Sequence, residues 1–141
     1  MRSFRQAWSQ WGGLIIALAS AAAILGVGLS CFGIWDPYES YVAEAARLKM
    51  QGKPAEPVQG LRSGLIGWAF SLVGVREWTG RLVLVIAALL CLWAAFVLVK
   101  RIEGKQAGIA TLWVLLSTPL FLLHSRQMFG ESLSFLVQTL V

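Results

Sequence analysis

The chain has 141 residues, of which 57% are hydrophobic and 13% are charged, and its formal net charge is +5. Soluble globular domains carry about 25% charged residues, so this composition excludes an ordinary water-facing domain. It predicts an all-α integral membrane protein that crosses the bilayer several times as a polytopic helical bundle. The basic residues are dispersed rather than clustered, which argues against nucleic acid as a partner.

Long charge-free stretches predict where the chain crosses the bilayer, because a spanning helix needs about 20 apolar residues. The sequence predicts a first span at about 13–35, a second at 81–100, and a third at 106–124 with Pro119 near its exit. A fourth apolar stretch at 131–141 is too short to cross. We therefore expect the chain to be the N-terminal part of a longer membrane domain.

The distribution of Lys and Arg predicts the orientation, because the cytoplasmic loops of membrane proteins are enriched in both. Residues 1–12 contain Arg2 and Arg5 and no acidic residue, and the short connection 100–105 contains three basic residues. Both segments are therefore expected to be cytoplasmic. The long segment 36–80 then forms a large extracytoplasmic first loop.

This loop contains the patterns of two helices. Residues 37–51 place apolar side chains at i, i+3 and i+4 spacing, with charged residues off that face, which is typical of an amphipathic helix lying on a bilayer. Residues 62–76 enclose an uncharged stretch too short to span, which predicts an interfacial helix with Trp68 and Trp78 at the headgroup level. The predicted apolar face of the first helix is formed by Tyr38, Tyr41, Val42, Ala45 and Leu48.

Asp36 follows the first predicted span directly and has two interpretations. With Pro37 and Glu39 it forms a standard helix start, in which aspartate is the N-cap, proline is N1 and the glutamate at N3 completes the cap. It is also a carboxylate held at a membrane surface, where it could act on a substrate. The two roles are compatible, because a capping carboxylate keeps one oxygen for a substrate.

The number of spans places Asp36 and the segment "HSRQMFGES" at the same membrane face, whichever way the chain is oriented. Ionisable groups at the ends of spans are functional candidates in a chain so poor in charge. Those gathered at this face are Asp36, Glu39, Arg62, His124, Arg126 and Glu131.

Three motifs occur in order along the chain: "WDPYESYVAEAARLKMQGK", "GWAFSLVGVREWTGRL" and "SRQMFGESL". Together they resemble the N-terminal part of membrane glycosyltransferases of the GT-C superfamily, in the group of aminoarabinose transferases and protein O-mannosyltransferases. Glu77 and Arg81 stand in the matching places of the second motif. The chain departs from the family at "LRSGL", where Arg62 stands near a usual Lys-Pro-Pro-Leu stretch, and at Glu131, where the family usually has aspartate.

The resemblance implies an enzyme that moves a sugar from a polyprenyl-phosphate donor to a lipid, glycan or protein acceptor. The reaction would occur at the extracytoplasmic face of a bacterial inner membrane, among membrane lipids, with the N-terminus in the cytoplasm. Asp36 would be the general base that removes the proton of the acceptor hydroxyl. Arg62 and Arg126 would bind the donor phosphate, because guanidinium groups form bidentate hydrogen bonds. Glu131, with Glu39, would orient the acceptor or share a divalent metal ion, which Asp36 and Glu131 would hold.

Several of these residues also have purely structural interpretations. Arg62 and Arg126 can anchor helix ends by reaching lipid phosphates. His124, a weak candidate, is a single histidine at a span end and can be a plain interface residue. Glu77 and Arg81 are four positions apart on a predicted helix and are expected to pair with each other.

The alternative function is a non-catalytic membrane assembly or transport subunit, or an inactive family member. A transporter places ionisable residues at mid-bilayer in broken spans. The predicted spans of this chain are unbroken and its charges lie at their ends, which favours chemistry at the membrane surface.

Overall fold

The computed structural model describes residues 2–31, 38–53, 60–127 and 138–139. This part of the chain is all-helical, as the sequence predicts. Its helices are α1 (Arg2–Gly26), α2 (Tyr38–Met50), α3 (Gly60–Val73), α4 (Glu77–Glu103), α5 (Lys105–Ser117) and α6 (Pro119–Arg126). The two helices predicted in the first loop are therefore present as α2 and α3.

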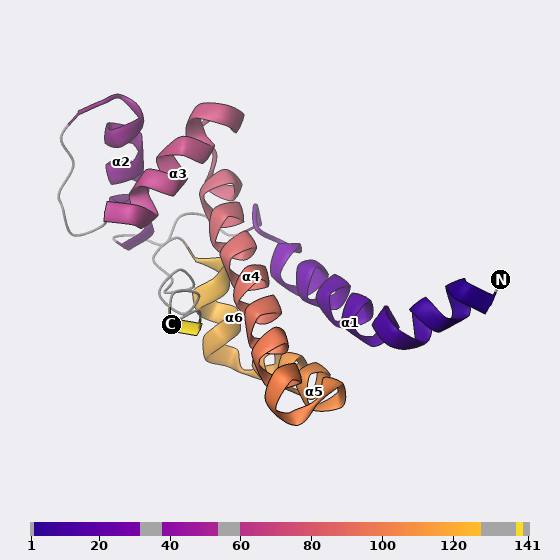
Figure 1. The fold of residues 1–141 in the computed structure, drawn as a ribbon. Helices are drawn as coiled ribbons and strands as arrows, with labels where there is room; N and C mark the ends of the chain where they lie inside the picture. The colour runs from indigo at the N-terminus through magenta and orange to yellow at the C-terminus, as the bar shows by residue number, and fades with distance from the viewer. Residues whose placement is uncertain (1, 32–37, 54–59, 128–137, 140–141) are drawn as a thin grey trace.

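Helix α4 is the centre of the fold and contacts α1, α3, α5 and α6 (Figure 1). Among the described residues, α4 is the only helix that is by itself long and apolar enough to cross a membrane. The α2–α3 pair lies at the N-terminal end of α4, and α5 lies at the opposite end (Figure 1). The position of α4 agrees with the second predicted span.

The first predicted span is helical over a shorter range than expected. Helix α1 ends at Gly26, and residues 27–31 form turns in which Gly28 has a positive φ of 78°. Glycine adopts this left-handed conformation without the steric penalty that a side chain incurs. Uninterrupted apolarity therefore predicted a helix that continues to about residue 35, whereas α1 begins earlier, at Arg2, and ends at Gly26.

The prediction of an unbroken third span was wrong. The stretch 106–124 is divided between α5 and α6, which are bent by 72° relative to each other at Thr118. Proline restricts the preceding residue to extended backbone, and Thr118 has φ −79° and ψ 113°. Pro119 also has no N–H to donate to the preceding turn. Unbroken spans were the reason against a transporter, and this reason therefore does not hold for residues 106–124.

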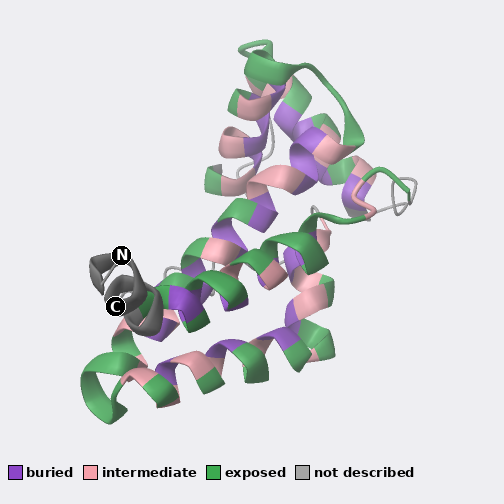
Figure 2. Cartoon of the chain, turned by 90° about the vertical axis from the view of Figure 1, so that its right-hand side faces the viewer, coloured by how far each residue is buried: buried purple, intermediate pink, exposed green. Residues whose placement is uncertain are grey.

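Two apolar clusters hold the helices together, with buried residues on the inward sides of the helices (Figure 2). The larger cluster joins α1, α4, α5 and α6, and Phe96, Leu92 and Leu112 are among its most buried members. The smaller cluster joins α2, α3 and α4 and consists of Val42, Ala46, Ile66, Phe70 and Leu84. The second cluster fixes the loop helices to the end of α4.

The apolar face of α2 is rotated from the predicted one. Val42 and Ala45 are buried as expected, but Ala46 is buried too and Tyr41 is exposed. The reason is the close approach of α3, because a Cβ added at Gly67 would lie only 2.7 Å from the backbone oxygen of Ala46. The buried face of α2 therefore packs on a neighbouring helix.

Candidate functional site

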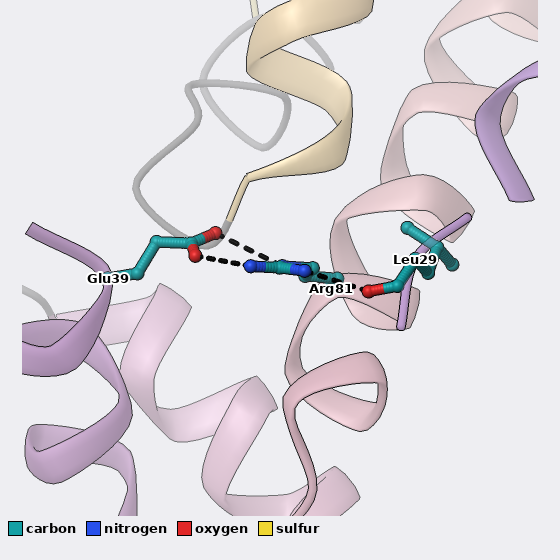
Figure 3. Close-up of polar contacts among 3 residues, drawn as sticks. All are labelled: Leu29, Glu39 and Arg81. Carbon is teal, nitrogen blue, oxygen red and sulfur yellow. Dashed lines mark hydrogen bonds and ion pairs between the residues drawn. The ribbon is translucent and has the colours of Figure 1, made fainter. Parts of the chain in front are cut away.

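A buried ion pair joins α2 to α4 (Figure 3). Arg81 Nη2 donates to Glu39 Oε2 at 2.6 Å, and Arg81 Nε donates to Glu39 Oε1 at 3.3 Å. The side chain of Glu39 is fully buried, and that of Arg81 is 5% exposed. Both carboxylate oxygens are thus engaged by one guanidinium in a bidentate arrangement.

The same guanidinium reaches the exit of α1. Arg81 Nη1 donates to the carbonyl oxygen of Leu29 at 2.8 Å, so the guanidinium lies between this carbonyl and the Glu39 carboxylate (Figure 3). The turn after α1, the first turn of α2 and the first turns of α4 therefore meet at one side chain. Arginine suits this position because its planar fork presents several donors in fixed directions.

The pair is expected to be important for stability because both charges are removed from water. An ionised group that is buried without a partner is very costly. Removing one member of a buried pair typically destabilises a protein by about 3–5 kcal/mol, since the other charge is left uncompensated. The start of α2 is thus held in place by an interaction that tolerates little change.

The expected pairing of Glu77 with Arg81 was wrong. Glu77 lies in the first turn of α4 and is exposed, whereas Arg81, one turn deeper, is buried. An exposed ion pair contributes little free energy, while the buried guanidinium requires a buried anion. Glu39 on another helix supplies it.

A second arginine reaches the exit of α1 from α6. Arg126 Nη2 donates to the carbonyl oxygen of Val27. The same nitrogen would lie 3.4 Å from a Cβ added at Gly28, so the guanidinium rests against this glycine. Within the described part of the chain, Arg126 is partly exposed and has no carboxylate partner. The ends of α1 and α6 therefore meet at the same end of α4.

The structure places the remaining predicted site residues as follows. Asp36 and Glu131 lie outside the described residues. Arg62 lies in the first turn of α3 and His124 in the last turn of α6, and both are partly exposed. Of the predicted site residues, Glu39 and Arg126 therefore lie near the exit of α1. Arg126 contacts the exit directly, and Glu39 is joined to it through Arg81.

The described residues contain no group of three or more His, Cys, Asp or Glu side chains that could hold a metal ion. The two carboxylates predicted to hold a divalent ion, Asp36 and Glu131, both lie outside that part of the chain. Metal binding therefore stays a prediction.

Arg81 is the member of the buried ion pair that the sequence analysis did not assign to the site. Its position in the second motif was recognised, but it was expected to pair locally with Glu77. A usable indication was present, because Arg81 directly precedes the long apolar stretch 82–99, and a charged residue inside such a helix requires a partner. The identity of that partner could not be read from spacing, since Glu39 is 42 positions away.

Within the described part of the chain, these features define an all-helical protein with one helix long and apolar enough to cross a membrane and with a buried ion pair where its helices meet. The profile of the dolichyl-phosphate-mannose-protein mannosyltransferase family matches residues 63–141, more than half of the chain. The chain belongs to this family, which confirms the resemblance predicted from its motifs. No curated protein and no solved structure match it. Arg81, Arg126 and Glu131 lie within the matched region, and Asp36 and Glu39 precede it.

Proposed function

We propose that the protein is a glycosyltransferase that moves a sugar from a polyprenyl-phosphate donor to an acceptor at the extracytoplasmic membrane face, with Asp36 as general base. Membership of a family described by dolichyl-phosphate-mannose, a lipid-linked sugar, supports the donor class. The observation that carries the proposal is the buried Glu39–Arg81 pair. This pair anchors the start of α2 where the chain leaves the Asp36 segment.

The length of the chain between Asp36 and Glu39 limits how far apart they can be. Three residues reach at most about 11 Å even when fully extended, so the Cα of Asp36 lies within that distance of the Cα of Glu39. Both oxygens of Glu39 accept hydrogen bonds from Arg81, which leaves Glu39 poorly suited to orient an acceptor. We assign Glu39 and Arg81 to positioning Asp36.

In the proposed reaction the bond between the sugar's anomeric carbon and the donor phosphate breaks, and a bond from that carbon to the acceptor oxygen forms. The proton of the acceptor hydroxyl passes to the Asp36 carboxylate, which makes the oxygen a better nucleophile as the new bond forms. The leaving lipid phosphate keeps the electron pair. It therefore gains negative charge that cationic groups must stabilise.

Arg126 is the proposed cation for this phosphate. Its guanidinium donates to Val27 and has no carboxylate partner in the described part of the chain, so its charge is available to an anion. The neighbouring Gln127 has a buried Oε1 without a hydrogen-bond partner, an acceptor that a sugar hydroxyl could use. Arg62 would assist from α3. Glu131 would orient the acceptor or, with Asp36, hold a divalent ion that lowers the charge of the phosphate.

The test uses the full-length protein reconstituted with a panel of radiolabelled polyprenyl-phosphate sugars. Wild type is compared with Asp36→Asn, which keeps the shape and part of the capping capacity of the side chain while removing the base. Transfer by wild type and its loss in Asp36→Asn at equal expression supports the proposal. The control is Glu44→Gln, an exposed carboxylate of α2, which should transfer normally. Equal transfer by wild type and Asp36→Asn would refute Asp36 as the base.

A non-catalytic transport or assembly subunit, or an inactive family member, is the second candidate. The 72° break between α5 and α6 favours transport, because transporters build their sites from broken helices. The same panel decides between the two functions. No transfer by the wild-type protein, under conditions in which active family members transfer, would favour this candidate.

A further inference from the structure

Basic residues gather at the end of α4 that lies opposite the α2–α3 pair (Figure 1). Lys100 and Arg101 lie in the last turn of α4, and Lys105 begins α5 directly after Gly104. The connection 100–105 contains one acidic residue, Glu103. Lys100 and Arg101 are both exposed, so this end of the helix presents a net positive charge on the surface.

The ammonium group of Lys100 is held by two aromatic rings. Lys100 Nζ lies 4.9 Å from the centroid of the Trp11 ring in α1 and 5.8 Å from that of the Phe96 ring. Both distances are within the range of cation–π interactions, which extends to about 6 Å. A ring attracts the ammonium group without neutralising its charge, so Lys100 can bind an anion at the same time.

Tight packing of α1, α4 and α5 fixes the surroundings of these rings. A Cβ added at Gly108 in α5 would lie 2.9 Å from the Phe96 ring, and one added at Gly13 in α1 would lie 3.0 Å from Ile109. Phe96 itself is only 1% exposed. The three helices thus position Lys100 before any ligand binds, which lowers the entropic cost of binding.

The length of α4 places these cations at the level of lipid headgroups. At 1.5 Å per residue the uncharged stretch 82–99 is about 27 Å long, close to the hydrocarbon thickness of about 30 Å. Lys100 and Arg101 directly follow this stretch. In a bilayer crossed by α4, both side chains would therefore lie where the lipid phosphates lie.

We propose that Trp11, Lys100, Arg101 and Lys105, together called the basic junction, bind the headgroup of an anionic phospholipid. Lys100 and Arg101 would donate charge-assisted hydrogen bonds to the phosphate oxygens. Basic pockets between membrane helices are suited to such headgroups. A zwitterionic lipid carries an ammonium group that these cations repel, so the charge of the basic junction selects an anionic lipid.

Apolar side chains beside the cations favour a lipid over a soluble anion. Trp11 is 45% exposed, and Ile102, which directly follows Arg101, is 70% exposed. Tryptophan is enriched at the membrane interface, where one part of the ring contacts hydrocarbon and the other contacts headgroups. A phosphate with attached acyl chains meets both the charge and the apolar surface of the basic junction.

This binding does not depend on the proposed chemistry. The Glu39–Arg81 pair lies at the other end of α4, in its first turns. A lipid at the basic junction would hold α1, α4 and α5 together at the opposite membrane surface. A protein with no transferase activity would bind it in the same way.

The test measures lipid binding to the full-length protein by native mass spectrometry in detergent. The probes are phosphatidylglycerol, which is anionic, and phosphatidylethanolamine with the same acyl chains, which is zwitterionic. Wild type is compared with Lys100→Gln/Arg101→Gln and with Trp11→Leu. The matched control, Arg47→Gln/Lys53→Gln, removes two exposed cations outside the basic junction. Thermal unfolding without added lipid checks the fold, and a variant that does not fold is replaced by Arg101→Gln/Lys105→Gln.

Wild type and the control should bind phosphatidylglycerol about tenfold more tightly than phosphatidylethanolamine, because charge-assisted hydrogen bonds are gained. Lys100→Gln/Arg101→Gln should lose this preference, and Trp11→Leu should weaken it severalfold. Equal affinity of wild type for the two lipids, or an unchanged preference in Lys100→Gln/Arg101→Gln, would overturn the proposal.

Glycerol 3-phosphate, which carries the charge without acyl chains, identifies the source of the phosphate. Displacement of phosphatidylglycerol at a similar concentration would show a site for a soluble anion and would also overturn the proposal. Absence of sugar transfer with an intact preference for phosphatidylglycerol would refute the proposed function alone.

Discussion

Arg81 at the beginning of α4 holds the carboxylate of Glu39 at the beginning of α2 with hydrogen bonds of 2.6 and 3.3 Å, across 42 positions of the chain. The same guanidinium donates to the carbonyl of Leu29 after α1. One side chain thus fixes the exit of one helix and the start of another against α4. The segment that contains Asp36 runs between these two fixed points.

The first prediction concerns this ion pair. Arg81→Gln or Glu39→Gln should lower the free energy of unfolding by about 3–5 kcal/mol, because each change leaves a buried charge without its partner. The double variant Glu39→Leu/Arg81→Met should recover most of the loss, since apolar residues of similar size need no partner. Thermal unfolding in detergent measures these changes. The double variant should still transfer poorly if the pair positions Asp36.

Glu44→Gln is the matched control on α2, because Glu44 pairs with Arg47 on the surface. Exposed ion pairs contribute only about 0–1 kcal/mol, so its unfolding temperature should change little. If Glu39→Gln were as well tolerated as Glu44→Gln, the pair would not hold α2. A double variant with wild-type transfer would exclude the positioning role.

The second prediction concerns the contact between α2 and α3. Gly67→Ala should destabilise the protein by about 1–3 kcal/mol, because overpacking a tight contact forces the backbone to shift. The added methyl would lie 2.7 Å from the backbone oxygen of Ala46, which has little room to move. Gly64→Ala in the same helix is the control, since its methyl would meet nothing within 4 Å. It should be neutral or stabilise the helix by about 0.5–1 kcal/mol. Equal effects of the two changes on thermal unfolding would contradict the close packing.

The third prediction concerns Arg126 in the transfer reaction. Arg126→Gln should lower kcat/KM for the lipid-linked donor about tenfold to a hundredfold, because hydrogen bonds to a charged phosphate are lost. The effect should fall mainly on KM for the donor, since the phosphate is charged before the reaction as well as during it. Arg126→Lys should recover part of it by keeping the charge. Steady-state kinetics with varied donor concentration gives both constants.

Arg101→Gln is the control for this experiment. Arg101 is exposed at the opposite end of α4, so its loss should leave KM unchanged. A lower unfolding temperature of Arg126→Gln with unchanged KM would instead make Arg126 an anchor that holds the α1 exit through Val27.

The fourth prediction concerns orientation. Cys31 is exposed after α1, whereas Cys91 is buried in α4. If the N-terminus is cytoplasmic, Cys31 faces the other side of the membrane. A membrane-impermeant thiol reagent added to intact cells should then label Cys31 and spare Cys91. In a Cys31→Ser background, Gln106→Cys should be labelled only after the membrane is permeabilised. Labelling of Gln106→Cys in intact cells would reverse the assigned orientation.

Much of the fold could be predicted because runs of apolar residues and their spacing indicate helices from the local sequence. Apolar runs predicted helices at α1, at α4 and along the stretch that α5 and α6 share, and the patterns of residues 37–51 and 62–76 predicted the two helices of the first loop. The errors lie where the backbone responds to single residues. Gly28 and Pro119 ended helices that apolarity would have continued, since one permits a left-handed turn and the other prevents helical backbone before it.

The site could be predicted only in part, for a different physical reason. Composition and motif order by themselves predicted the all-helical class and the family. The gathering of Asp36 and Glu131 with the other charged residues at one membrane face stays a prediction. Nothing in the sequence indicated that Arg81 would form its ion pair with Glu39 rather than with Glu77, which is nearer along the chain. Only the tertiary structure decided this, because packing α2 and α3 against α4 buries Arg81 and Glu39 together while Glu77 stays in contact with solvent. A buried charge must find its partner in space, whatever its distance along the chain.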